Sequence, residues 1–373
     1  WLQEEKNLDV ITYTADLGQG DISDDLEEKA KNLGATKVIV EDLTEEFISD
    51  YVFPMFRCNT IFEGEYLLGA AIARPLIAKK LVEIGKREGT NIICHGATGK
   101  GNDQIRFEIG AHALNPSIEV IAPWRDWDMV SRTDLMNYCK NHQIPMPASK
   151  AEEPPFSMDE NLLHISYEGG VLEDLNNAPP EDMWLNTKSL ENASEKSEEI
   201  AIEFSKGDPV ALNGKTLSSA QLFRELNLLG GKHGIGRIDI VESRVTGMKS
   251  RGCYETPGGT ILLKTRRAME SLCLTGEEIK NKDKLIPDYA ALIYEGLWWS
   301  NKRVSLQSEI DSVSNKVNGK VSVKLYKGNI ISISKESSNS LYNENKVSFE
   351  EEGGFSNEDM QSHIKKNILD YDI

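Results

Sequence analysis

Residues 95–104 read His95-Gly96-Ala97-Thr98-Gly99-Lys100-Gly101-Asn102-Asp103-Gln104, a glycine-rich turn between an expected strand at residues 91–95 and an expected helix at residues 105–114. Backbone N–H groups in such a turn can approach an anion, and the N-terminus of the following helix favours negative charge. The spacing differs from a Walker A loop, which places four residues between its first glycine and a Gly-Lys-Ser/Thr string. Thr98, Lys100, Asn102 and Asp103 add polar side chains, which favours a binding site over a bare turn.

Short apolar runs alternate with helical patterns on both sides of this turn. The runs at residues 10–14, 37–40, 91–95 and 118–122 are typical of buried strands, and residues 24–30, 67–86 and 131–141 have the pattern of helices. This alternation predicts an α/β fold with a parallel, doubly wound sheet that has helices on both faces. Ligands bind such sheets at the carboxyl ends of the strands, which is also where Asp16-Leu17-Gly18-Gln19-Gly20 lies.

A proline-rich stretch marks a change in organisation, because four prolines fall between residues 145 and 155. We expect one domain over residues 1–147, a second over residues 148–350 and a C-terminal tail over residues 351–373. In the second domain, alternation at residues 321–333 around Lys327-Gly328-Asn329 predicts a β-hairpin. In the tail, Met360, Ile364 and Ile368 form one apolar helical face, typical of a helix that docks on another subunit.

Composition excludes several classes of protein. The chain has 373 residues and a net charge of −18, which argues against a general nucleic-acid binder. It has no apolar run long enough for a membrane span and no signal-peptide pattern at its start. Five widely spaced cysteines without a C-x-x-C pair predict reduced thiols in a cytoplasmic protein.

Several catalytic patterns are missing. The six histidines have no metal-ligand spacing, so no resident metal is expected, and no G-x-S-x-G elbow occurs. Cys94 is expected in the core, and Trp298-Trp299 in a core or an interface. Two further stretches stand out. Residues 157–166 have a serine at each end, and residues 242–259 are so rich in charge and glycine that we expect a shaped loop.

Together these stretches resemble one family, the argininosuccinate synthases, in order along the whole chain. The resemblance is carried by Thr14 to Gln19, Tyr66 to Gly69, Ala73 to Ile77, His95 to Asp103, Ser157 to Tyr167, Gly234 to Arg237, Asp239 to Glu242, and Gly247 to Gly259. It implies a nucleotide-binding domain of the ATP-pyrophosphatase type, an α+β synthetase domain and a C-terminal oligomerisation helix. It also implies a homotetramer.

The resemblance implies an ATP-dependent ligase that joins citrulline to aspartate through a citrullyl-adenylate and releases AMP and pyrophosphate. Such chemistry depends on positioning and electrostatics, so no covalent nucleophile is expected. Mg²⁺ is expected on the ATP phosphates. The implied ATP positions are Ala15 and Gly96, and the implied aspartate positions are Thr98, Asn102 and Asp103. The implied citrulline positions are Tyr66, Asn102, Arg106, Ser157, Ser166, Glu242 and Tyr254.

This sequence departs from the family pattern in two ways. Family members carry a strand and a Ser-Gly-Gly pyrophosphate loop near their start, and this sequence contains no Ser-Gly-Gly string. Without that strand and loop, the 373-residue chain is expected to be a poor and unstable catalyst. Ala71 stands where the family often has a hydroxyl side chain, so one contact to citrulline is expected to be absent or made by water.

Two other functions compete with the ligase. One is an ATP-pyrophosphatase that thiolates tRNA, which the net charge and the lack of a cysteine pair oppose. The other is a catalytically impaired fragment or a silent assembly subunit with the same fold.

Overall fold

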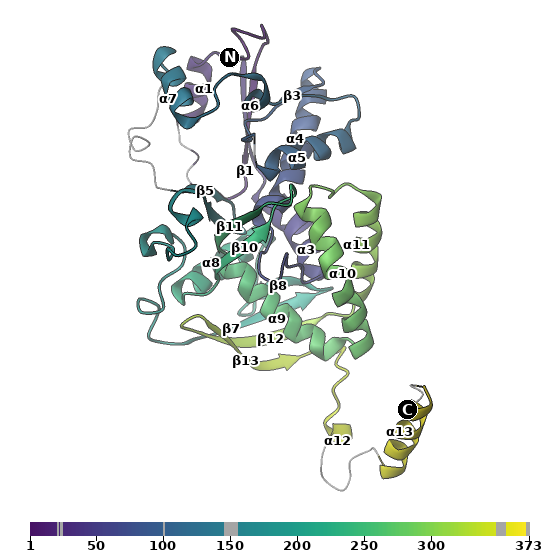
Figure 1. Cartoon of the computed structure of the whole chain (residues 1–373). Coiled ribbons are helices and arrows are strands. Elements are labelled where there is room, and N and C mark those ends of the chain that lie inside the picture. The colour runs from purple at the N-terminus through teal and green to yellow at the C-terminus, as the bar shows by residue number, and fades with distance from the viewer. Residues whose placement is uncertain (21, 23–24, 100, 145–155, 348–355, 371–373) are drawn as a thin grey trace.

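The computed structural model describes residues 1–20, 22, 25–99, 101–144, 156–347 and 356–370, with side chains omitted at 132, 345, 346 and 357. Figure 1 shows a body of two parts, from which the C-terminal helix stands apart. We call residues 1–144 the N-terminal part and residues 156–336 the C-terminal part. The expected domain boundary at 147/148 falls outside the described residues.

The described residues of the N-terminal part form four short strands, and the helices predicted at 24–30, 67–86, 105–114 and 131–141 are present together with several shorter ones. Its elements are β1 (Ile11–Asp16), α1 (Leu26–Asn32), β2 (Lys37–Asp42), α2 (Thr44–Phe47), the π-helical turn η1 (Ile48–Val52), α3 (Phe53–Arg57), α4 (Gly69–Glu88), β3 (Ile92–Cys94), α5 (Asn102–Leu114), β4 (Glu119–Ile121), α6 (Pro123–Asp126) and α7 (Arg132–Asn141). Ser131 caps α7 by accepting a hydrogen bond from the N–H of Asp134 at 3.1 Å, as its position before the helix predicts.

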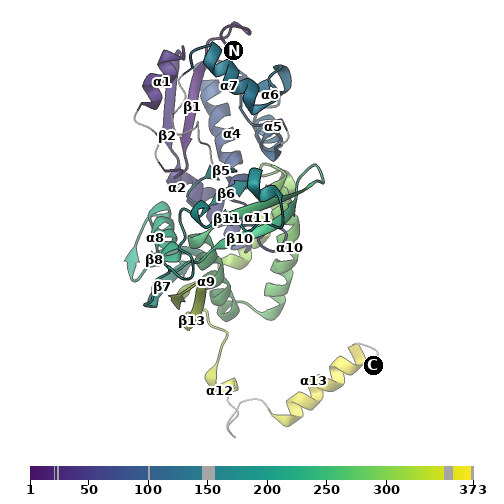
Figure 2. The ribbon, with the colours of Figure 1, turned by 60° about the vertical axis from the view of Figure 1, so that its left-hand side comes forward.

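The parallel strands form two separate pairs, β1 with β2 and β3 with β4. Among the described residues no strand joins the pairs into one sheet. The α/β fold is therefore confirmed, with its parallel sheet divided. Figure 2 shows β1 and β2 side by side and α4 next to α5, which packs closely against it.

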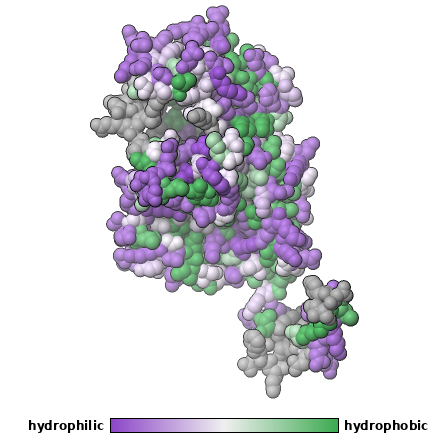
Figure 3. All heavy atoms as spheres, viewed as in Figure 1, coloured by the Kyte–Doolittle hydropathy of each residue, from purple (hydrophilic) through white to green (hydrophobic). Residues whose placement is uncertain are grey.

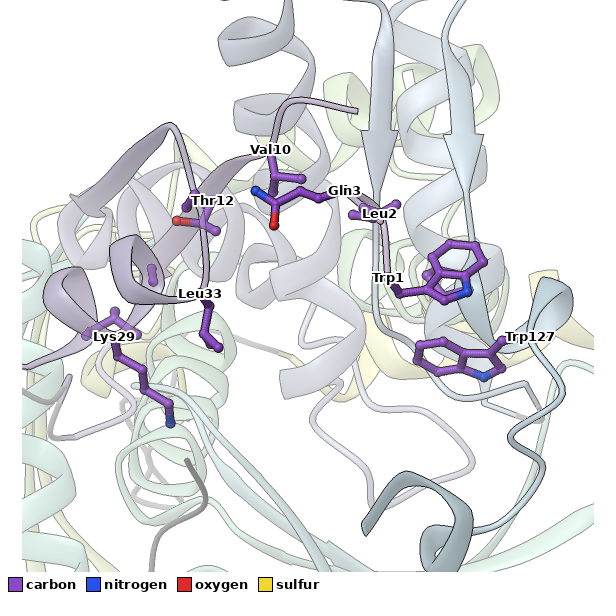
Figure 4. Close-up of a pocket in the computed structure, with 12 residues that line it drawn as sticks. Trp1, Leu2, Gln3, Val10, Thr12, Lys29, Leu33 and Trp127 are labelled. Carbon is purple, nitrogen blue, oxygen red and sulfur yellow. The ribbon is translucent and has the colours of Figure 1, made fainter. Parts of the chain in front are cut away.

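An apolar pocket of about 440 Å³ lies beside β1, between the N-terminal residues and the end of β4. It is lined by Thr12 of β1, by Val10 just before β1 and by Trp127 just after α6 (Figure 4). Trp1 packs edge-on against Trp127, with ring centroids 6.0 Å apart. The pocket is lined mainly by apolar atoms, although Thr12 and Lys29 add polar groups to it.

The C-terminal part contains two antiparallel sheets covered by long helices. Its elements are β5 (Ser157–Glu160), β6 (Ile165–Glu168), the 3₁₀ turns η3 (Gly170–Glu173) and η4 (Glu181–Met183), β7 (Glu198–Ser205), β8 (Asp208–Leu212), β9 (Lys215–Thr216), α8 (Ser219–Lys232), β10 (Arg237–Ser243), β11 (Lys249–Glu255), α9 (Pro257–Cys273), α10 (Gly276–Tyr294), α11 (Asn301–Ser314), β12 (Gly319–Tyr326) and β13 (Asn329–Glu336).

One sheet has the strand order β10-β11-β6-β5, and the other has the order β13-β12-β7-β8-β9. The predicted hairpin is confirmed, because β12 pairs with β13 across a turn at Lys327 and Gly328. The prediction of a shaped loop over residues 242–259 was wrong. These residues form the end of β10, a short turn that contains Gly247, β11 with Gly252, and the start of α9 with Gly258 and Gly259.

A single hydrophobic core connects the two parts of the body. Phe47, Met55 and Phe56, from the short helices after β2, are at most 1% exposed and belong to the same core as Phe223 and Ile261. Trp298 lies in this core, stacked on Tyr51 at 5.3 Å, as its sequence suggested. Because the apolar contacts are continuous, the N-terminal and C-terminal parts are held in a fixed relation at the site described next.

The tail consists of α12 (Glu344–Val347) and α13 (Asn357–Asp370), which extend away from the body in Figures 1 and 2. Met360, Ile364 and Ile368 are 44–50% exposed, and Figure 3 shows apolar atoms of this segment open to solvent. In the described part of the chain, no helix is both long and apolar enough to span a bilayer.

Candidate functional site

The turn after β1 packs directly against the C-terminal part. Asp16 Oδ1 accepts a hydrogen bond from the N–H of Gly18 at 2.8 Å, and Ala15 O accepts one from Gln19 Nε2 at 2.7 Å. Leu17 O accepts a hydrogen bond from the N–H of Leu162, in the β5–β6 turn, at 2.8 Å. Ala15 therefore lies at a strand end that adjoins the second part of the molecule.

The glycine-rich turn follows β3, as the sequence predicts, and leads into α5. A Cβ atom on Gly96 would meet no atom of the described residues within 4 Å, so close packing against them does not require glycine there. Thr98 is exposed, and its carbonyl accepts hydrogen bonds from the N–H of Gly101 at 3.1 Å and from Gln104 Nε2 at 2.5 Å. Lys100 lies outside the described residues.

Asp103, in the first turn of α5, is held by the buried Arg106 and the half-buried Arg74. Its carboxylate accepts hydrogen bonds from Arg74 Nη2 at 2.8 Å and from Arg106 Nη1 at 3.0 Å. Burial alone would raise the pKa of Asp103, but the two guanidinium groups outweigh it and lower the pKa to about 2. Arg74 also binds Asp159 of β5 at 2.6 Å, so this charge cluster connects the two parts of the body.

Glu242, on β10, accepts hydrogen bonds from two tyrosines and is only 7% exposed. Tyr254 OH donates to its Oε2 at 3.0 Å, and Tyr294 OH donates to its Oε1 at 2.9 Å. Burial raises the pKa of Glu242, while both hydroxyls and Arg106 oppose that rise. Asn102 Nδ2 donates to Tyr294 OH at 3.0 Å, so α5 and β10 share this tyrosine.

An aromatic wall lies next to Glu242. Tyr66 stacks on Tyr254 with ring centroids 4.3 Å apart, and His164 stacks on Tyr254 at 5.9 Å. His164 is 2% exposed, and neither of its ring nitrogens has a hydrogen-bond partner. Burial lowers its pKa to about 4, so the ring is neutral at pH 7. Gly69 is required beside it, because a Cβ there would lie 2.2 Å from His164 Cγ.

The structure brings most of the predicted site residues together across the two parts of the body. The connected residues are Tyr66, Asn102, Asp103, Arg106, Glu242 and Tyr254. Ser166 lies opposite Tyr254 in the β6–β11 pairing, and its hydroxyl donates to Asp159 O at 3.3 Å. Ser157 is exposed at the start of β5 and lies opposite Glu168.

Three residues of this cluster were missed by the sequence reasoning as site residues. Arg74 and His164 lie inside motifs that carried the family resemblance, so those motifs contained a signal for them. Tyr294 lies at the end of α10, in a stretch without any motif, and only the folded structure places it beside Asn102 and Glu242.

Metal binding at this site concerns a resident ion and an ion that arrives with the nucleotide. Among the described residues, no group of three or more His, Cys, Asp or Glu side chains could hold a metal ion. A Mg²⁺ ion that arrives on nucleotide phosphates needs only one or two protein carboxylates, so the residues present are compatible with it.

Comparison with known proteins gives matches over both parts of the chain. The family model described as the arginosuccinate synthase N-terminal HUP domain matches residues 1–145, and the model described as the arginosuccinate synthase C-terminal domain matches residues 156–373. The chain is 56% identical to an argininosuccinate synthase of Helicobacter hepaticus over 100% of its own length and 93% of that protein. Similar matches occur to enzymes of the same name from Nitratiruptor (56%, covering 100% of the chain and 92% of that protein) and Stutzerimonas stutzeri (55%, covering 99% and 91%).

Proposed function

Since this chain belongs to the argininosuccinate synthase family, we propose that the site between its two parts binds citrulline, aspartate and ATP together. The chain is a carbon–nitrogen ligase of arginine biosynthesis that forms argininosuccinate and releases AMP and pyrophosphate. The observation that carries the proposed site is the contact of Asn102 on α5 with Glu242 on β10 through Tyr294. This contact connects a residue with an implied role toward both amino acids to one with an implied role toward citrulline, which supports a shared site.

The citrulline end of the site is proposed around Arg106 and Glu242. The guanidinium of Arg106 has the geometry to bind a carboxylate, and the buried Glu242 carboxylate can accept hydrogen bonds from ureido or amino nitrogens. Tyr66 and Tyr254 form the wall beside them, and Ser157 and Ser166 supply hydroxyls from the β5–β6 hairpin.

The aspartate end is proposed at the N-terminus of α5, with Thr98, Asn102 and Asp103. Asp103 stays ionised at neutral pH because two arginines lower its pKa, so it can hold the ammonium group of the incoming amino acid. The nucleotide is proposed to lie between Ala15 and Gly96, at the carboxyl ends of β1 and β3. Mg²⁺ bound to the ATP phosphates would neutralise part of their charge.

The reaction follows in two balanced steps. The ureido oxygen of citrulline attacks the α-phosphorus of ATP, and the bond to pyrophosphate breaks. The amine of aspartate then attacks the activated ureido carbon, loses a proton, and AMP leaves with the ureido oxygen. The protein contributes positioning and electrostatic stabilisation, so none of its residues is proposed to act as a covalent nucleophile.

A labelling experiment tests this function. The chain is incubated with ATP labelled at the α-phosphate, with citrulline and aspartate added singly or together. We expect labelled AMP only when both amino acids are present. Labelled ADP, or turnover that requires tRNA, would contradict the proposal. The family match over the whole chain favours the ligase over the impaired or silent alternatives.

The domain division and the cellular location are proposed together with this function. We propose that residues 1–147 bind the nucleotide, that residues 148–350 form the synthetase domain, and that residues 351–373 serve assembly. The family matches at 1–145 and 156–373 support such a division. A cytoplasmic location is supported by the five cysteines, all of which are free thiols.

We propose a homotetramer in which α13 docks on a neighbouring subunit. The support is its exposed apolar face, and the double substitution Ile364→Glu and Ile368→Glu tests it. We expect the variant to elute as a smaller species than the wild-type tetramer in gel filtration, because two charges on a buried face oppose docking. Lys365→Glu and Lys366→Glu on the same helix serve as the control. A wild-type monomer, or a variant that remains tetrameric, would be evidence against the proposal.

A further inference from the structure

Tyr294 contacts residues from both parts of the site but belongs to no motif. It is 2% exposed at the last position of α10. Its hydroxyl accepts a hydrogen bond from Asn102 Nδ2 at 3.0 Å and donates one to Glu242 Oε1 at 2.9 Å.

The direction of these hydrogen bonds is fixed by the neighbouring backbone. Asn102 Oδ1 accepts a hydrogen bond from the N–H of Val245 at 3.2 Å, and a backbone N–H can only donate. The amide NH₂ group of Asn102 is therefore turned toward Tyr294. The phenol oxygen accepts from it and keeps its own hydrogen for the Glu242 carboxylate, so the three groups form an ordered chain.

The ring of Tyr294 makes contacts of a second kind. Arg106 lies over one face, with its Cζ 4.8 Å from the ring centroid, and Arg106 Nε donates to Tyr294 O at 2.8 Å. Phe62 stacks on the ring at 4.0 Å with an interplanar angle of 2°, and it lies in the turn that leads to Tyr66. The turn after α10 allows this approach, because Gly296 has φ +82° and a Cβ there would lie 2.8 Å from Arg106 Cα.

We propose that Tyr294 is a positioning residue for citrulline, whose hydroxyl holds the Asn102 amide and the Glu242 carboxylate in register across the two parts of the site. This role rests on the proposed function. Tyr294 acts through the groups that touch the substrate, and its ring also sets the orientation of Arg106. Losing the hydroxyl would remove one of the hydrogen bonds that Glu242 accepts and leave the Asn102 amide anchored by its bond from the Val245 N–H.

Tyr294→Phe tests the role of the hydroxyl, because it keeps the ring, the Phe62 stack and the contact with Arg106. Tyr289→Phe is the matched control: Tyr289 is buried in the same helix, and its hydroxyl bonds to Gln307, away from every predicted binding residue. We expect Tyr294→Phe to raise the KM for citrulline about tenfold, the effect of losing one hydrogen bond to a charged group, with the KM for ATP unchanged. Tyr289→Phe should leave the KM for citrulline unchanged.

The pH profile gives a readout that a structural role would not move. The charged and titratable groups that face Glu242 are Arg106, Tyr66, Tyr254, Tyr294 and Glu168. Tyr294 stabilises the ionised carboxylate, so its removal raises the pKa of Glu242. The acid limb of kcat/KM for citrulline should therefore move to higher pH in Tyr294→Phe and stay in place in Tyr289→Phe.

The outcomes separate this proposal from the proposed function. If the wild-type chain forms AMP with both amino acids but Tyr294→Phe matches Tyr289→Phe in KM and pH profile, the positioning role is wrong and the function stands. A wild-type chain without citrulline-dependent AMP overturns both. If Tyr294→Phe does not fold, Phe62→Leu loosens the ring but keeps the hydroxyl. It should raise the KM for citrulline about threefold, and an unchanged KM would refute the role.

Discussion

Replacing Glu270 by alanine is expected to destabilise the chain by about 3–5 kcal/mol, because it leaves two buried cations without their shared anion. Glu270 is 0% exposed, and its carboxylate binds Arg266 and, at 3.2 Å, Lys282 Nζ. Asn59 Nδ2 donates to it at 2.6 Å. Arg266 and Lys282 are 1% and 2% exposed, so neither can turn to water when the carboxylate is lost.

The size of this effect is large against the whole stability of a domain, which is about 5–15 kcal/mol. Burial opposes the charge on Glu270, but Arg266 and Lys282 prevail and lower its pKa below the ordinary 4.5. A carboxylate with a lowered pKa in the folded state contributes stability above its unfolded pKa. That contribution is lost as the pH falls through the folded value. Acid should therefore destabilise the wild type at this cluster and leave Glu270→Ala unaffected there.

Urea denaturation of Glu270→Ala, Glu270→Gln and the control Glu277→Ala checks this prediction. Glu277 is exposed in the first turn of α10, so its removal should change the free energy of unfolding by less than about 0.5 kcal/mol. Glu270→Gln keeps the shape and some hydrogen bonds, and it should fall between the other two. A loss below about 1 kcal/mol in Glu270→Ala would mean that the cations find other partners or water.

The sequence predicted the N-terminal part well because its strands are short apolar runs between polar turns. Ile92, Ile93 and Cys94 form such a run, and the following glycines mark where the chain leaves the sheet. The β12–β13 hairpin was equally clear, since Val321, Val323 and Leu325 alternate with polar residues and all three are buried. Local patterns suffice to predict an element when one of its faces is buried and the other is exposed to solvent.

The helices of the C-terminal part were harder to predict because they are buried on more than one side. In α9, Thr265, Arg266 and Glu270 are buried together with the apolar residues, so charge and polarity do not mark a solvent face. Pro287 lies inside α10, where a sequence pattern favours a helix end. Propensity gives way to tertiary packing in both helices.

The candidate site was predictable only as far as its motifs extend. Asn102, Glu242 and Tyr254 lie in stretches whose residue types already suggest binding. The connection of Asn102 with Glu242 depends on Tyr294, which is 192 positions from Asn102 and 52 from Glu242. A single tyrosine at a helix end has no sequence signal of its own, so this part of the site emerges only when the helix packs against α5 and β10.

Asp103→Asn is expected to lower kcat/KM for aspartate by about 10²-fold, because the substrate ammonium would lose a half-buried, charge-assisted partner. The carboxylate of Asp103 stays ionised above about pH 2, so at neutral pH it presents a full negative charge to the site. Asparagine keeps the size and one acceptor oxygen but removes that charge. Arg74 keeps its second partner, Asp159, so the loss should fall on the substrate and not on the fold.

Steady-state kinetics with each substrate varied in turn measures this effect, and the unfolding midpoint shows whether the variant is folded. The control is Asp288→Asn, which removes an exposed carboxylate paired with Lys302 and should leave kcat/KM within twofold of the wild type. The effect should be larger for aspartate than for citrulline, because the implied citrulline contacts run through Arg106 and Glu242. A uniform loss for both amino acids would instead indicate that Asp103 acts by holding Arg106, from which it accepts a hydrogen bond at 3.0 Å. An unchanged kcat/KM for aspartate would remove Asp103 from the site altogether.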